Sequence, residues 1–127
     1  MEPFTWYSDY SVHDEELDGH HKVLFDIFNR LYDHCIDMNK TSHLGQIIEE
    51  LKSYSNYHFL AEERHMKKSG YPGIDMHINK HRDFAIKTLQ LQQMTYNNEQ
   101  EAAKQMVVFL GNWLLHHVIE EDKKFAA

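Results

Sequence analysis

Several residue types are scarce in this chain of 127 residues, and each scarcity excludes a class of protein. The only cysteine, Cys35, excludes an internal disulfide framework and suits a reducing compartment. The longest apolar stretch, residues 107–115, is interrupted by Gly111 and Asn112 and is too short to span a bilayer. The first residues carry no basic region followed by an apolar one, so no signal peptide is visible. We therefore expect a cytoplasmic protein that does not bind membranes.

Basic residues are also few relative to acidic ones. The chain has 13 Lys and Arg against 20 Asp and Glu, which gives a net charge of −7. Nucleic acid is an improbable partner for such a surface, because phosphates attract basic patches. No cluster of Lys or Arg marks a membrane-binding surface or a partner-binding tail. The length corresponds to one domain with a hydrophobic core, which we take as residues 1–127.

Proline and glycine interrupt the chain rarely, with two and five occurrences. Between these breaks the apolar residues recur at helical spacing, which predicts helices over residues of about 18–38, 43–68, 74–93 and 99–119. Asp18 is the expected N-cap of the first helix. Four amphipathic helices with short connections favour an all-α fold, an antiparallel up-down-up-down four-helix bundle. Residues of about 1–17 are expected to form an irregular arm, and the bundle is expected to end near residue 122.

Histidine is the abundant exception, with 11 occurrences. Five histidines and two carboxylates lie in register with the apolar stripes of the predicted helices, a pattern that indicates metal binding. Residues four apart are neighbours on a helix, so His58 with Glu62, and His77 with His81, can each approach one metal centre. His117 and Asp122 are five apart, which suits a helix that loosens near its end. The candidate ligands are His21, His58, Glu62, His77, His81, His117 and Asp122.

Seven side chains exceed the four of a closed zinc site and suit two ions that share bridging ligands. Imidazole combined with carboxylate favours iron or manganese over magnesium or calcium, although manganese or zinc could replace iron. A zinc-protease site is excluded because the segment from His77 to His81 lacks the glutamate of HExxH. The single ExxH, Glu62 to His65, has no second copy, so we do not interpret it as a ferritin-type site. With only two carboxylates, the set favours reversible oxygen binding over oxygen activation.

Two of the candidate ligands have a second histidine beside them. His20 is rotated by about 100° from the stripe that carries His21, so His21 is favoured. The same argument favours His117 over its neighbour, because Leu110 and Trp113 share its face. His34 is expected to face solvent or to lie at a helix end. No metal-binding role is assigned to His20, His34, His65 or His116.

The segments around these candidate ligands resemble the hemerythrin family, and in particular its stand-alone bacterial members. The resemblance covers nearly the whole chain, although position 20 is His where the family commonly has Gln. It implies a non-haem di-iron centre that binds O2 reversibly, for storage, delivery or sensing. His77, His81 and His117 would hold one iron, His21 and His58 the other, and Glu62 and Asp122 would bridge them together with an oxo or hydroxo group. The matching segments are Asp18–Phe25, His58–Glu63, His77 to Phe84, and Trp113–Val118 followed by Asp122.

Oxygen would bind at the iron that carries two histidines, without a side chain acting as acid or base. The resemblance therefore implies a monomeric oxygen-binding protein, not an enzyme, with no catalytic residue and with nitric oxide as a second possible ligand. A di-iron oxidase, peroxidase or nitric-oxide-handling enzyme remains an alternative, as does a bundle in which the metal is stored or is only structural. Side chains near the ligands are expected to form a dry lining of the oxygen pocket. They are Leu24, Phe59, Trp113, Leu114 and Val118.

Overall fold

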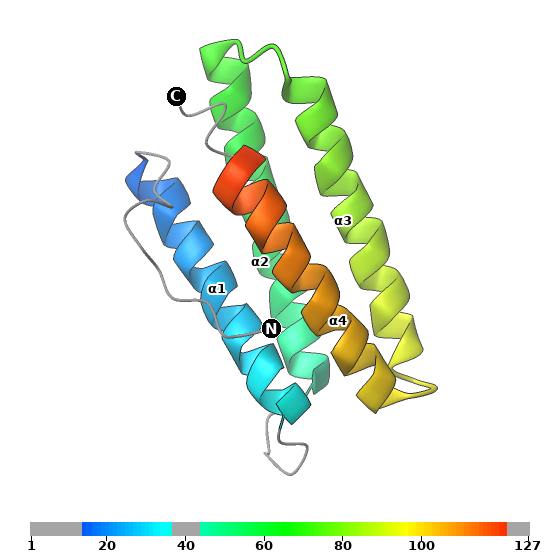
Figure 1. The fold of residues 1–127 in the computed structure, drawn as a ribbon. Helices are drawn as coiled ribbons and strands as arrows, with labels where there is room; N and C mark the ends of the chain where they lie inside the picture. Colours follow the sequence, from blue (N-terminus) through cyan, green and yellow to red (C-terminus); the bar gives the residue numbers. More distant parts are fainter. Residues whose placement is uncertain (1–13, 37–43, 122–127) are drawn as a thin grey trace.

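The computed structural model describes residues 14–36 and 44–121. They form four α-helices and a terminal π-helix: α1 (Glu15–Ile36), α2 (Leu44–Ser69), α3 (Ile74–Met94), α4 (Glu99–Trp113) and η2 (Leu114–Glu121). Within the described ranges there is no strand. Helix α1 packs against α2 and α4, and α3 packs against the same two helices (Figure 1). The predicted all-α four-helix bundle is confirmed.

The first helix begins earlier than the sequence pattern predicts. The backbone N–H of Leu17 donates a hydrogen bond of 3.0 Å to Oδ1 of Asp14, and three acidic residues fill the first turn. Asp14 is therefore the cap, because its carboxylate satisfies an N–H group that has no partner within the helix. The prediction of Asp18 as N-cap is wrong. The expected arm lies almost entirely outside the described residues, so its boundary stays a prediction. The acidic first turn also favours this start, since it lies at the positive end of the helix dipole.

The other helix boundaries agree with the predicted ones within one or two residues, apart from the change of helix type at Leu114. Helix α2 ends before Gly70, whose φ of 69° lies in the left-handed region that glycine adopts without strain. The Asn98 side chain caps α4 by accepting a hydrogen bond of 3.1 Å from the N–H of Glu101. The predicted loosening near His117 is present, because η2 is a π-helix, which joins residues five apart.

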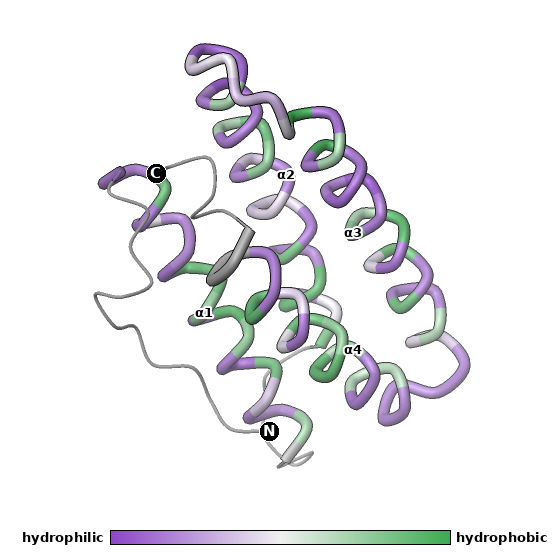
Figure 2. Tube along the Cα trace, turned by 45° about the horizontal axis from the view of Figure 1, so that its top comes forward, coloured by the Kyte–Doolittle hydropathy of each residue, from purple (hydrophilic) through white to green (hydrophobic). Residues whose placement is uncertain are grey.

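Aliphatic and aromatic side chains from all four helices fill the centre of the bundle. Along each helix, hydrophobic and hydrophilic stretches alternate (Figure 2). Phe28 and Leu24 of α1, Leu51 of α2, Phe84 of α3 and Leu110 of α4 are almost completely buried. Each contributes about 1.5–3 kcal/mol by its removal from water. No helix in the described part of the chain is long and apolar enough to cross a bilayer.

The ends of two helices also bury a histidine, His34. His34, near the end of α1, is only 4% exposed, and its Nε2 lies 3.7 Å from Oε1 of Glu99 at the start of α4. Of the two alternatives predicted for His34, the position at a helix end is confirmed and exposure to solvent is wrong. The side chain is buried because the start of α4 lies against this turn. Cys35, its neighbour, is a free thiol that is only partly buried.

Candidate metal centre

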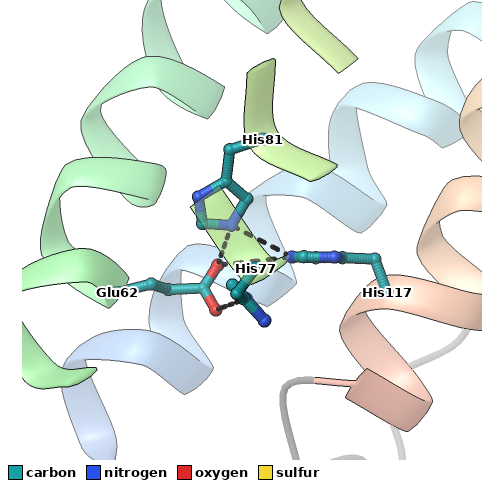
Figure 3. A group of neighbouring side chains, drawn as sticks. All are labelled: Glu62, His77, His81 and His117. Carbon is teal, nitrogen blue, oxygen red and sulfur yellow. Dashed lines mark hydrogen bonds and ion pairs between the residues drawn. The ribbon is translucent and has the colours of Figure 1, made fainter. Parts of the chain in front are cut away.

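The antiparallel arrangement brings candidate ligands from α1, α2, α3 and η2 to one end of the bundle. His21 lies in the first turns of α1, His58 and Glu62 in the second half of α2, His77 at the start of α3 and His117 in η2. Glu62 occupies the middle of this group and is fully buried. Figure 3 shows its carboxylate facing the histidines of α3 and η2.

The first group consists of Glu62, His77, His81 and His117, whose donor atoms lie within 4.8 Å of one another. Nε2 of His77 is 3.3 Å from Oε2 of Glu62, and Nε2 of His81 is 3.7 Å from Oε1. Nε2 of His117 is 3.9 Å from the same Oε1 and 3.1 Å from Nε2 of His81 (Figure 3). Three imidazole nitrogens and one carboxylate therefore surround a single small volume.

The second group consists of His21, His58 and Glu62, again with donor atoms within 4.8 Å. Nε2 of His58 is 2.6 Å from Oε1 of Glu62. The rings of His21 and His58 meet edge to face with centroids 4.7 Å apart, and both side chains are fully buried. Glu62 belongs to both groups, so this one carboxylate connects two possible metal positions.

The donor spacings of the first group fit a transition-metal ion. Two ligand atoms bonded at about 2.1 Å to one ion lie about 3 Å apart when their bonds are at right angles, and farther apart at wider angles. The distances of 3.1 to 3.9 Å among His81, His117 and Glu62 agree with this range. Neutral nitrogen donors combined with a carboxylate suit iron, manganese or zinc.

Burial keeps three of the candidate histidines in the form that binds metal. Loss of solvent lowers the pKa of His21 to about 3 and that of His81 to about 4. The same cause holds the pKa of His117 well below its usual value, and the negative charge of Glu62 opposes the shift in all three. These imidazoles are therefore neutral near pH 7, with a nitrogen lone pair available for a cation.

Aromatic side chains pack against the two groups. Phe59 lies between them: its ring stacks on that of His81 with centroids 4.0 Å apart, and its centroid is 6.0 Å from that of His58. Trp113 stacks on His117 with centroids 4.3 Å apart. Leu24 and Leu114, also expected in the pocket lining, are completely buried. Apolar side chains packed in this way restrict the access of water to the donors.

The structure brings together six of the seven candidate ligands from the sequence. The seventh, Asp122, lies outside the described residues, as does the side chain of Val118. Two contacts, made by the Nδ1 atoms of His81 and His58, were not predicted from the sequence. Nδ1 of His81 is 3.1 Å from Oε2 of Glu63, and Nδ1 of His58 is 3.0 Å from Nδ1 of His20. The only available signal was sequence adjacency, since both residues directly precede or follow a candidate ligand.

Comparison with known proteins gives matches over almost the entire chain. Residues 12–127 match the family model described as hemerythrin HHE cation binding domain. The bacteriohemerythrin of Methylococcus capsulatus is 31% identical, covering 85% of this chain and 82% of its own length. That of Clostridium acetobutylicum is 25% identical and covers 96% and 98%. A crystal structure of wild-type hemerythrin superposes with a TM-score of 0.81 at 26% identity, covering 97% of this chain and 95% of the other.

Proposed function

Since this chain belongs to the hemerythrin family and resembles its bacterial members, we propose that it binds dioxygen reversibly at a non-haem di-iron centre. The observation that carries the proposal is that Glu62 belongs to both groups of possible metal ligands. One buried carboxylate connects a group of three histidines to a group of two, which gives two unequal metal positions. We take residues 1–127 as one hemerythrin-like domain and expect a monomer that stores, delivers or senses O2.

In this proposal His77, His81 and His117 hold one iron ion, and His21 and His58 hold the other. Glu62 bridges the two, and Asp122 is proposed as a second carboxylate bridge. Two ferrous ions bound there would supply one electron each to dioxygen, and a bridging hydroxo group would supply the proton. The position with two histidines has fewer protein ligands, so it is the one expected to remain open to oxygen.

The protein side chains contribute position, neutrality and exclusion of water. The low pKa values of His21 and His81 mean that neither of these two rings must lose a proton before it binds a cation near pH 7. The aromatic rings packed on His81 and His117 would limit the access of water to the metal positions. No side chain is required as acid or base, which supports binding of oxygen in preference to turnover of a substrate.

The test is the visible spectrum of anaerobic, ferrous protein during one cycle of O2 addition and removal. A charge-transfer band that appears with oxygen and vanishes on its removal supports the proposal. An irreversible change to the diferric form would instead favour a redox enzyme, and stability gained from metal without any spectral response would favour a structural metal site. The variant His58→Ala should lose the band, because the two-histidine position is then under-ligated. His65→Ala, on the same helix but paired with Asp14 at 3.5 Å, is the matched control.

A further inference from the structure

The ring of His58 is held from both sides. Its Nε2 faces Oε1 of Glu62 at 2.6 Å, and its Nδ1 faces Nδ1 of His20 at 3.0 Å. His20 is itself only 6% exposed. The rings of Tyr54 and Tyr57 lie beside it, with centroid distances of 5.7 and 4.9 Å. His20 is thus a fixed, buried partner of a proposed ligand, at a position that the sequence left without a role.

Hydrogen-bond chemistry gives this contact a direction. A metal ion on Nε2 of His58 occupies that lone pair, so the ring proton of the neutral imidazole must be on Nδ1. The Nδ1–H of His58 then donates to Nδ1 of His20, which accepts. Neutral His20 therefore carries its own proton on Nε2. The contact selects the metal-binding tautomer of His58 and fixes the rotation of its ring.

We propose that His20 is a positioning residue for the two-histidine metal position, acting through the hydrogen bond that His58 Nδ1–H donates to it. This inference rests on the proposed function, because it assumes a metal ion at His58. Outer partners that orient a ligand in this way typically change metal affinity by about 10- to 100-fold.

The two adjacent histidines of α1 then serve one metal position from different sides. Successive residues are about 100° apart around a helix, so neighbours in sequence point in different directions. His21 belongs to the donor group with His58 and Glu62, whereas His20 contacts the outer edge of His58. The three-histidine group has a different outer partner, because Nδ1 of His81 lies 3.1 Å from a carboxylate oxygen of Glu63. The neutral acceptor adds no charge at the two-histidine position.

The experiment is a titration of metal-free protein with Co²⁺, followed by its visible absorption. The wild type should bind two ions. His20→Ala should bind the first ion normally and the second about 10- to 100-fold more weakly. His20→Gln should recover most of the lost affinity, because its amide oxygen can accept the same hydrogen bond. If His20 served only in packing, His20→Gln would not restore the affinity for the second ion alone.

His116→Ala is the matched control, because His116 also neighbours a proposed ligand but is exposed. It should leave both affinities unchanged. Thermal unfolding of each metal-free variant checks that it folds. If His20→Ala does not fold, His20→Leu replaces it, because leucine also cannot accept a hydrogen bond. If His20→Ala (or His20→Leu) bound the second ion as tightly as the wild type, the inference about His20 would be overturned. It would also be overturned if His20→Gln bound the second ion as weakly as that variant. Neither result would affect the proposed oxygen binding. A wild type that binds two Co²⁺ ions, but whose ferrous form fails to bind O2 reversibly, would overturn only the proposed function. Binding of fewer than two ions would refute both.

Discussion

Glu62 gives the sharpest prediction, because one substitution at this residue should weaken two metal positions. Its Oε1 is 2.6 Å from Nε2 of His58 in one group, and its Oε2 is 3.3 Å from Nε2 of His77 in the other. Glu62→Gln keeps the size of the side chain but removes its negative charge and one acceptor oxygen. His58→Ala and His77→Ala should each damage a single group.

The expected size follows from ligand linkage. An ion present at 100 times its dissociation constant stabilises the folded protein by about 2.7 kcal/mol. The entropy of unfolding of a 127-residue domain is about 0.27 kcal/mol per kelvin at its melting temperature. Each occupied position should therefore raise Tm by about 10 °C, and two positions by about 20 °C. A position weakened about 100-fold contributes only about 0.4 kcal/mol, or less than about 2 °C.

The assay is anaerobic thermal unfolding with and without Fe²⁺, followed by circular dichroism. The wild type should gain about 20 °C and each single-histidine variant about half of that. Glu62→Gln should gain almost nothing, although its metal-free form remains folded. If Glu62→Gln kept half of the wild-type increase, the carboxylate would serve only one position, and the shared-bridge argument would be refuted.

Two further predictions concern the pocket lining and the buried histidines. Leu114→Ala should lower the free energy of unfolding by about 2–5 kcal/mol, because Leu114 is completely buried. The same variant should speed autoxidation by admitting water. An unchanged autoxidation rate would remove Leu114 from the proposed pocket lining. In metal-free protein, the lowered folded-state pKa values of His21 and His81 mean that the unfolded chain binds more protons below pH 6.5. The stability that these two groups contribute should therefore be present above about pH 6.5 and fall by about 2 kcal/mol per pH unit between pH 6 and 4. Urea unfolding measures this fall, and a flat profile would contradict the burial of these rings.

The helices were predictable because their apolar residues follow a clear period and because Gly70 and Asn98 mark real breaks. The error at the first helix has a local cause. Asp14 and Asp18 are both suitable caps by residue type, and only the start of the helix decides between them. A periodic pattern sets which face is buried, but it does not determine where the first turn begins.

The site was predictable to the extent that burial follows the helical stripe. The stripe placed His58 and Glu62 on one inward face, one turn apart. It could not predict contacts between helices, which depend on their relative rotation and height. The contact of His20 with His58, and that of Glu63 with His81, are of this kind. The burial of His34 likewise arises from the neighbouring helix and not from its own sequence.

The π-helix η2 leads to a last prediction about the second bridging carboxylate. Glu121 and Asp122 both follow His117, four and five residues later. An α-helix would place the residue four positions on beside His117, but π-helical hydrogen bonding joins residues five apart. A π-helical path continued to residue 122, which lies outside the described residues, would bring the side chain five positions on nearer to His117 than an α-helix would, so we keep Asp122 as the proposed partner. Asp122→Ala should lose much of the metal-dependent increase in Tm, whereas Glu121→Ala should retain it; the opposite ranking would show that the π-helical geometry does not select the bridging ligand.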